Sequence, residues 1–569
     1  MGLRKMICRL GVFDIPIIQM QPPFMVDLLD SNIIVFGSAM SGKTTFLRTL
    51  VNILHKAYSH KQEQIFVLDF GGALFDLAEM PLVSAYFDNS NEEYVKRVFK
   101  ILESILKDNL DRLGGKNYRD SEVDLPHTTF IIDNLNAFLD EPRYMSYQEK
   151  LAKLCREGLS KGITIVVTAS ETKGTSSYMG SFKQKIAYEM QQDKYMEIFG
   201  NKVGMIGNNP GHGFANVTVK PDGITGTFRM NLPYEVQSFL PYGTDKDAEN
   251  LFENRLKDKF GFAEGCYKHH VKKYQTFPKE LTEIEFAGLN QNPLVELTDN
   301  SVSVGLDYVD FKSVDVNYEK SHTIAIYGKK EFGKTNLLTL LAKRIIEQRK
   351  DVRFVLFDDG RNQLQPIYDM VCKEVDAVLI NQYKEVELLL NDETSKIRKL
   401  SPLQQFYVYL NQNYATLDKR FLAGIYGLSK EFAKEYAKIP DCENEKQPFT
   451  IFVLQSKLLY LNTIENKFFI NVILPQMVAV AEENGFCFIF SDVQKISDSE
   501  QNMYFNNALQ TAFLLDNIAE FAGERGQKTI FGNMDIKTLK EDYARCELGD
   551  GYFYDIEADR LSKLKFIKV

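Results

Sequence analysis

The chain alternates short, continuous apolar runs with longer stretches in which apolar and polar residues mix at helical spacing. In the first half the apolar runs are 33–36, 65–68, 129–132 and 163–169. In the second half they are 324–327, 353–357, 450–454 and 487–490. Such runs are typical of strands buried on both faces of a parallel sheet, with helices between them. The pattern predicts two α/β units, each a mostly parallel sheet flanked by helices.

A glycine-rich motif follows the first of these runs in each half. It reads Gly37-Ser38-Ala39-Met40-Ser41-Gly42-Lys43-Thr44 in the first half and Gly328-Lys329-Lys330-Glu331-Phe332-Gly333-Lys334-Thr335 in the second. Both fit G-x-x-x-x-G-K-[ST], and each stands between a predicted strand and a predicted helix. In that setting the loop and the helix N-terminus present free backbone N–H groups to phosphates. The chain therefore has two candidate ATP sites.

Each position of the motif has an expected role in binding ATP with Mg²⁺. The two lysines, Lys43 and Lys334, are expected to reach the outer phosphates, and Thr44 and Thr335 are expected to hold the metal. The candidate nucleotide-binding residues are Gly37, Ser38, Ser41, Gly42, Lys43, Thr44 and Thr45 in the first half, and Gly328, Gly333, Lys334, Thr335 and Asn336 in the second.

Hydrolysis of ATP also needs an acid at the end of a nearby strand, and here the two halves differ. Asp133 follows the third apolar run and is the candidate catalytic acid and Mg²⁺ ligand of the first site. Asn134 stands where a glutamate would activate water; an amide can orient a water but cannot accept its proton. The second half has Gln455 in place of the aspartate. We expect slow hydrolysis at the first site, and weak or no binding at the second.

Other polar residues offer alternatives to this assignment. Asp69, Asp358 and Asp359 also end apolar runs and are alternative Mg²⁺ ligands, above all in the second half, where Gln455 has no carboxylate. The adjacent His269 and His270 have no cysteine or acid at ligand spacing, so we interpret them as solvated linker residues rather than a metal site.

Length and charge set the broad class of protein. The 569 residues are too many for one core, and a polar stretch at 246–280 divides the chain into predicted domains 1–245 and 281–569. The net charge of −9 argues against tight nucleic-acid binding, which usually needs a basic face. The seven cysteines are scattered, as expected for reduced thiols in a cytoplasmic protein. No apolar run approaches the roughly 18 residues of a membrane span.

Several motifs resemble the FtsK/SpoIIIE branch of P-loop ATPases. They are the stretch 36–47 around the first glycine-rich motif, V-L-D-F-G-G at 67–72, G-L-S-K-G-I at 158–163 and P-G-H-G at 210–213. Within that branch the chain resembles the C-terminal part of EssC/YukB/EccC, the membrane motor ATPase of type VII secretion. The resemblance implies that 1–245 and 281–569 are the second and third of three tandem RecA-like ATPase modules, the third degenerate.

The resemblance also implies partners and a location. The expected partners are an upstream first ATPase module and membrane part, other membrane components of the secretion system, small WXG-type exported proteins and further copies in a hexamer. The expected location is the cytoplasmic face of the bacterial membrane. The FtsK-type arginine of the G-R-S-x-G-I stretch is replaced by Leu159; Arg156, one turn earlier, is either its substitute or a solvated helix residue.

The function implied is nucleotide binding and receipt of export substrates, with ATPase activity impaired at both sites. Two alternatives stay open at this point. One is a DNA-translocating ATPase, because FtsK relatives pump DNA. The other is a non-catalytic interaction scaffold whose two glycine-rich loops no longer bind nucleotide.

Overall fold

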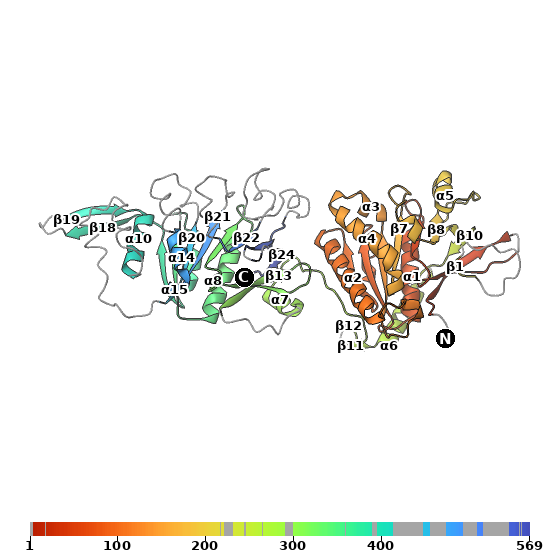
Figure 1. The fold of residues 1–569 in the computed structure, drawn as a ribbon, viewed down its shortest axis with the longest axis horizontal. Helices are drawn as coiled ribbons and strands as arrows, with labels where there is room; N and C mark the ends of the chain where they lie inside the picture. The colour runs from red at the N-terminus through yellow and green to blue at the C-terminus, as the bar shows by residue number, and fades with distance from the viewer. Residues whose placement is uncertain are drawn as a thin grey trace. The chain divides into compact units, whose positions relative to one another are not determined.

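A computed structural model gives the fold of the chain, which divides into two compact units, Met1–Thr276 and Phe277–Val569 (Figure 1). We call them the first and the second unit and describe each by itself. The structure describes residues 4–16, 19–90, 92–216, 218–220, 232–243, 246–263, 266–290, 300–358, 360–389, 395–413, 448–455, 474–492, 509–515, 546–556, 558 and 560–569.

The described part of the first unit contains a mixed sheet of ten strands in the order β2-β1-β10-β9-β8-β3-β7-β6-β4-β5. Six neighbouring strands are parallel: β8 (Gln184–Tyr188), β3 (Ile33–Phe36), β7 (Ile163–Ala169), β6 (His127–Asp133), β4 (Glu63–Asp69) and β5 (Val83–Asp88). Four antiparallel strands extend the sheet beyond β8: β9 (His212–Asn216), β10 (Pro233–Ser238), β1 (Ile7–Asp14) and β2 (Pro23–Asp27). The predicted parallel sheet is confirmed, and the antiparallel extension adds to it.

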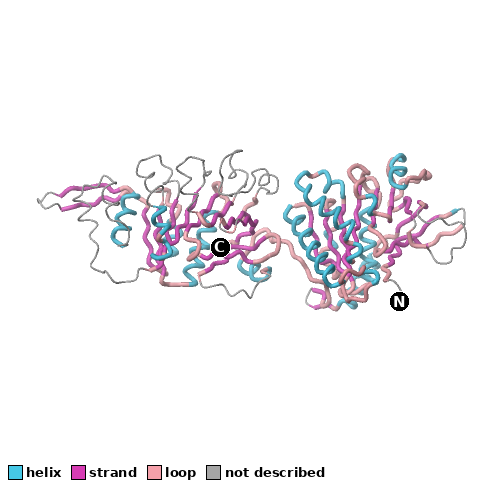
Figure 2. The backbone as a smooth tube through the Cα atoms, viewed as in Figure 1, coloured by secondary structure: helices cyan, strands magenta, loops and turns pink. Residues whose placement is uncertain are grey.

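Helices cover both faces of this sheet (Figure 2). On one face α1 (Lys43–Ala57) packs on the side chains of Ile33 and Val35, in a core that also holds α6 (Lys246–Phe260). On the other face α2 (Glu92–Leu113), α3 (Leu135–Asp140), α4 (Met145–Glu157) and α5 (Gln192–Phe199) pack on Ile34 and Phe36. Successive strand residues point to opposite faces, so a strand with both faces buried reads as an unbroken apolar run.

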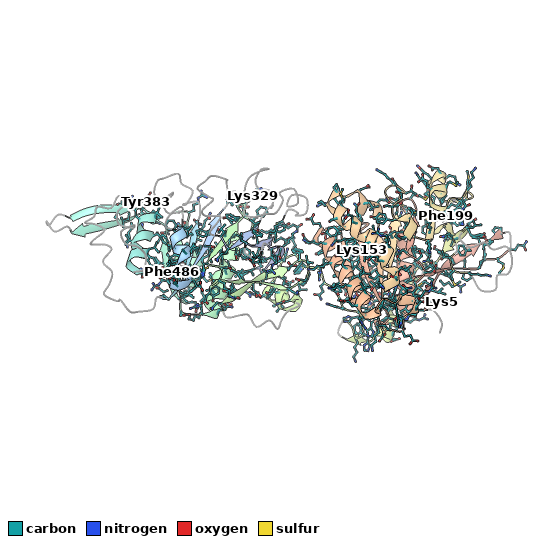
Figure 3. The ribbon with its side chains drawn as sticks, viewed as in Figure 1. Lys5, Lys153, Phe199, Lys329, Tyr383 and Phe486 are labelled. Atoms are coloured by element: carbon teal, nitrogen blue, oxygen red, sulfur yellow. The ribbon has the colours of Figure 1, made fainter. Side chains whose placement is uncertain are left out.

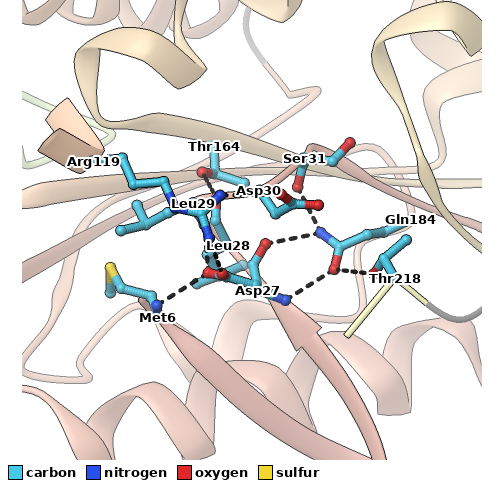
Figure 4. Close-up of polar contacts among 10 residues, drawn as sticks. All are labelled: Met6, Asp27, Leu28, Leu29, Asp30, Ser31, Arg119, Thr164, Gln184 and Thr218. Carbon is cyan, nitrogen blue, oxygen red and sulfur yellow. Dashed lines mark hydrogen bonds and ion pairs between the residues drawn. The ribbon is translucent and has the colours of Figure 1, made fainter. Parts of the chain in front are cut away.

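A polar network ties the antiparallel extension to the amino ends of the parallel strands (Figure 4). Asp27, at the end of β2, accepts hydrogen bonds through Oδ1 from the backbone N–H groups of Met6 and Leu29. Gln184, the first residue of β8, accepts from Asp27 N (2.9 Å) and donates to Asp27 O (3.0 Å). Arg119 adds an ion pair to Asp27 at 3.1 Å. These bonds hold the sheet together at the edge opposite the glycine-rich loop.

The second unit repeats this sheet strand for strand. Its described strands follow the order β14-β13-β24-β23-β22-β15-β21-β20-β16-β17. The parallel strands are β22 (Thr511–Leu514), β15 (Thr323–Tyr327), β21 (Phe486–Asp492), β20 (Phe449–Gln455), β16 (Val352–Phe357) and β17 (Asp376–Ile380). The antiparallel strands are β23 (Asp550–Asp555), β24 (Arg560–Phe566), β13 (Ser301–Asp307) and β14 (Ser313–Asn317).

Two cores also sandwich the second sheet. One contains α8 (Lys334–Gln348) and α9 (Gln365–Val371), with α7 (Glu283–Leu289) at its border; the other contains residues of α10 (Pro402–Asn413), α14 (Leu474–Ala479) and α15 (Ala481–Asn484). A separate hairpin, β18 (Lys384–Leu389) with β19 (Ser395–Leu400), follows Tyr383, which is 62 % exposed (Figure 3). Residues 414–447, which follow α10, lie outside the described residues.

The predicted linker stretch, 246–280, contains regular structure that packs on the first unit. Phe252, Leu256 and Phe260 of α6 are buried in the core around α1. A short hairpin of β11 (Phe262–Ala263) and β12 (Cys266–Tyr267) follows α6. Beyond it, Val271 N donates to Pro81 O (3.1 Å) and Tyr274 N donates to Ser84 O (2.7 Å), so the chain continues along β5.

Candidate nucleotide site

The first glycine-rich loop lies between the carboxyl end of β3 and the start of α1. Its backbone takes positive φ values at Met40 (62°) and Gly42 (105°). Lys43 folds back over the loop, and its Nζ donates to Gly37 O (2.6 Å) and Ser38 O (2.7 Å). Burial lowers the pKa of Lys43, while the nearby Asp133 carboxylate acts in the opposite direction. The ammonium group therefore lies at the centre of the loop that would receive a triphosphate.

A turn from the antiparallel part of the sheet braces this loop. Gly211, just before β9, donates its N–H to Ser41 O at 2.8 Å. A Cβ at position 42 would lie 2.7 Å from Gly211 N, so this contact needs glycine at 42, where φ is also positive. Ser41 Oγ is buried and has no hydrogen-bond partner among the described residues. An unpartnered hydroxyl inside the loop is suited to an oxygen-rich ligand such as phosphate.

Asp133 lies at the end of β6 and reaches the loop helix, although β7 separates β6 from β3. Its Oδ2 is 3.3 Å from Thr44 Oγ1, and its Oδ1 accepts a 2.5 Å hydrogen bond from Thr168 Oγ1. Burial raises the pKa of this carboxyl group, and the Thr168 hydrogen bond offsets part of that rise. The predicted pair of Mg²⁺ ligands, Thr44 and Asp133, is therefore adjacent in space.

The alternative acids have other partners. Asp69 accepts hydrogen bonds from the N–H groups of Gly71, Gly72 and Leu74 and from the Tyr86 hydroxyl. Asp358 caps the corresponding turn of the second unit through the N–H groups of 360, 362 and 364. Both carboxylates shape a turn at the end of a strand, and Asp359 lies outside the described residues. His269 stacks on His60, and the described residues hold no group of three metal-binding side chains.

The remaining predicted residues of the first site fall in two places. Asn134 follows Asp133 in a left-handed conformation (φ 66°) at the carboxyl edge of the sheet, and its N–H donates to Thr168 Oγ1. Thr45 lies in the first turn of α1. Arg156 is exposed near the end of α4, just before β7 begins, so it lies at the amino edge of the sheet and away from its own loop.

Sequence reasoning missed three residues that shape the first site. Glu189, after β8, accepts from Ser38 through two groups: its backbone oxygen accepts from Ser38 N (2.8 Å) and Oγ (2.7 Å), and its carboxylate accepts from Ser38 Oγ (2.6 Å). Thr168 holds Asp133, as described above, and Gly211 braces the loop. The P-G-H-G motif contained Gly211 but gave no sign of its contact, and nothing local marks Glu189 or Thr168.

The second loop repeats the lysine geometry without the acid. Lys334 Nζ donates to Gly328 O (2.6 Å) and Lys329 O (2.7 Å), and Gly333 has φ 93°. Gln455, at the end of β20, is 6 % exposed and donates to Gln363 Oε1. Asn336 holds the last residues of the chain: its Nδ2 donates to Ile567 O (2.9 Å) and its Oδ1 accepts from Val569 N (3.1 Å).

The residues of the two sites differ in how well they suit Mg-ATP. The first site combines the loop, Lys43, the unpartnered Ser41 hydroxyl and the Thr44–Asp133 pair, which together suit a triphosphate and its metal. The second site, with Gly328, Thr335 and Lys334, has the loop and the lysine, but its strand β20 ends in the carboxamide of Gln455, whereas β6 of the first unit ends in the carboxylate of Asp133. No helix in the described ranges combines the length and apolarity that a membrane crossing requires.

Comparison with known proteins agrees with this architecture. The FtsK/SpoIIIE family model matches residues 9–172. The ESX secretion system protein EccC of Geobacillus thermodenitrificans is 25 % identical over 352 residues, which are 60 % of this chain and 23 % of that protein. YukB of Bacillus subtilis is 26 % identical over 392 residues, covering 66 % of this chain and 24 % of that protein. The chain thus spans about a quarter of the length of these relatives.

Among solved structures, EssC (ATPases 2 and 3) from Geobacillus thermodenitrificans has a TM-score of 0.63 at 19 % identity, covering 99 % of this chain and 96 % of that one. This similarity shows the tandem fold. Residues 9–172 therefore match the FtsK/SpoIIIE family of P-loop ATPases, and the secretion proteins EccC, EssC and YukB are homologous to this chain over 60 %, 68 % and 66 % of its length.

Proposed function

We propose that this chain is a nucleotide-binding and substrate-receiving segment of a type VII protein secretion motor, at the cytoplasmic face of the membrane. The first site binds Mg-ATP and hydrolyses it slowly, and the second binds it weakly or not at all. The observation that carries the proposal is that Lys43, Thr44 and Asp133 meet at one loop in the first unit. The second unit has Gln455 at the position of Asp133.

The residues of the first unit would divide the work on ATP. The loop N–H groups and Lys43 bind the phosphates, while Thr44 and Asp133 hold the Mg²⁺, which supplies charge neutralisation on the phosphate oxygens when bound. Thr168 fixes the orientation of Asp133 by its 2.5 Å hydrogen bond. Asn134 can orient water but cannot take its proton, which supports binding with slow turnover.

The proposed partners follow from the relatives. EccC, EssC and YukB are named as secretion system proteins, which supports other components of such a system as partners, and the solved EssC structure with ATPases 2 and 3 supports an upstream ATPase module. A membrane part and a hexameric assembly complete the proposal. A structure of EccC (ATPases 2 and 3) from Thermomonospora curvata contains a signal sequence peptide; it has a TM-score of 0.59 at 16 % identity, covering 99 % of this chain and 93 % of that one. The signal sequence peptide in that complex supports exported proteins as the class of substrate, and we propose that small WXG-type proteins are the substrates received here.

The test is a titration of Mg-ATP against the full chain and two matched lysine variants. Lys43→Ala should remove most nucleotide binding, whereas Lys334→Ala should change it little. The two lysines have the same contacts, but only the first loop has the carboxylate of Asp133 beside its threonine. Turnover should stay well below the typical enzyme value of about 10 s⁻¹. Unchanged ATP affinity in Lys43→Ala would overturn the assignment of the first site.

A further inference from the structure

The internal duplication lets us compare the same surface in the two units. In the second unit a segment of that unit covers it, and in the first unit no described segment does. The two sheets have equivalent registers, which fixes the equivalence residue by residue. A Cβ on Gly11 would strike the backbone of 237 and 238, and one on Gly305 would strike the backbone of 565 and 566. Phe239 N donates to Leu10 O just as Ile567 N donates to Val304 O. Phe239 therefore corresponds to Ile567, and Leu240 to Lys568.

The loop helices correspond as well. Both α1 and α8 begin at the lysine of their glycine-rich motif, so Ile53 and Arg344 each lie ten residues beyond that lysine (53 − 43; 344 − 334). In each unit this helix contacts the chain segment that leaves the last antiparallel strand: Thr49 Oγ1 donates to Phe239 O in the first unit, and Asn336 Nδ2 donates to Ile567 O in the second.

In the second unit, the segment 279–289 covers this surface. Leu281 pairs with Ile567, and its oxygen accepts from Lys568 N at 2.8 Å. The helix α7 continues from there: Glu283 forms a 2.6 Å ion pair with Arg344, whose guanidinium lies 5.4 Å from the ring centre of Phe286. The result is a buried contact, with Leu281 only 1 % and Ile567 0 % exposed.

In the first unit the corresponding residues, Ile53, Phe239 and Leu240, line an open groove of about 560 Å³. Asn52, Lys56 and Arg9 also line it. Phe239 is 39 % and Leu240 is 54 % exposed, and Ile53 is partly exposed. The helix α6 packs farther along α1, where Lys259 donates to the backbone oxygens of His55, Lys56 and Tyr58. Among the described residues, no segment covers the groove as Leu281 and α7 cover its counterpart.

We propose that this groove docks a polypeptide segment with the chemistry of 279–289: an apolar residue in extended conformation, followed by a short acidic helix with an aromatic residue. The apolar residue would pack on Phe239 and Leu240, as Leu281 packs in the second unit. The stretch 278–290 carries one lysine and three glutamates, a net charge of −2 (1 − 3), and the groove is lined by two exposed cations, Arg9 and Lys56. The exposed apolar side chains and the charge of the groove therefore favour the same occupant.

The probe is a fluorescent synthetic peptide with the sequence of 278–290, added to the full chain and followed by fluorescence anisotropy. We expect saturable binding that weakens at least tenfold in Leu240→Asp and in Lys56→Glu. The control is Met205→Asp, since Met205 is 90 % exposed but does not line the groove. A peptide carrying Leu281→Asp should not bind. Circular dichroism and thermal unfolding verify that each variant folds.

Two outcomes would overturn the proposal. One is peptide binding that is absent at millimolar concentration, or equal in the groove variants and the control. The other is dimerisation of the chain in sedimentation experiments that Leu240→Asp abolishes and the peptide does not compete with, because a second copy would then be the occupant. Mg-ATP binding is measured in both groove variants as well. If it is retained, a failure of the docking proposal leaves the assignment of the first nucleotide site unaffected.

Discussion

Replacing Asp133 with asparagine separates two effects that this buried carboxylate has on the first unit. Asp133 is 3 % exposed, and burial raises the pKa of its carboxyl group. A raised pKa in the folded state means that protonation favours folding; this contribution is present at low pH and is lost as the pH rises through the folded-state pKa. At neutral pH the ionised carboxylate thus destabilises the ligand-free unit, and an asparagine, which cannot ionise, removes that cost.

The same substitution weakens the Mg-ATP complex. A ligand at 100 times its Kd stabilises the protein that binds it by about 2.7 kcal/mol, which raises Tm by roughly 5–11 °C in a unit of this size. Loss of one charged contact costs about 2 kcal/mol, so the same ligand concentration would then contribute only about 0.9 kcal/mol. We expect Asp133→Asn to raise the Tm without ligand and to lose most of the Mg-ATP shift.

Differential scanning calorimetry of the full chain measures both effects, with and without Mg-ATP. Each unit can unfold in its own transition, so we assign the first by its response to Lys43→Ala. The control is Asp108→Asn, an exposed carboxylate on α2, which should change neither value. An Asp133→Asn protein that keeps the full Mg²⁺-dependent shift would refute the role of this carboxylate in binding the metal.

Two further predictions concern the second site and the acid stability of the first unit. Gln455→Asp places a carboxylate at the end of β20 and should strengthen Mg-ATP binding by Lys334 and its loop. Calorimetric titration measures this affinity in a Lys43→Ala background, where the first site no longer binds. Unchanged affinity would show that the second site does not lack an acid. His55 is buried and neutral: Leu82 N donates to its Nε2, its Nδ1 contacts Val51 O, and burial lowers its pKa from 6.5 to about 4. As the pH falls, the unfolded chain therefore takes up the proton before the folded chain does. The unfolding free energy should fall by about 3 kcal/mol as the pH drops from 6.5 to 4. Urea titrations at several pH values measure this fall, which should be smaller in His55→Gln.

The sequence alone determined those features that depend on neighbouring residues. Continuous apolar runs predicted the central parallel strands, because a strand buried on both faces has no polar side. The glycine-rich motifs predicted both loops and their lysines, since a strand, a tight turn and a helix start follow one another locally. Asp133 and Gln455 could be compared because each ends the corresponding strand.

Only the tertiary structure decided what brings distant segments together. The brace on Ser41 comes from Gly211, the contact to Ser38 comes from Glu189, and the bond that holds Asp133 comes from Thr168. Thr168 lies in β7, and the other two partners lie at the ends of β8 and β9. Which strands become neighbours in a sheet depends on how the whole chain packs, so the sequence did not show these contacts. The groove beside Phe239 likewise became visible only when the two folded units were compared, because exposure is a property of the packed chain.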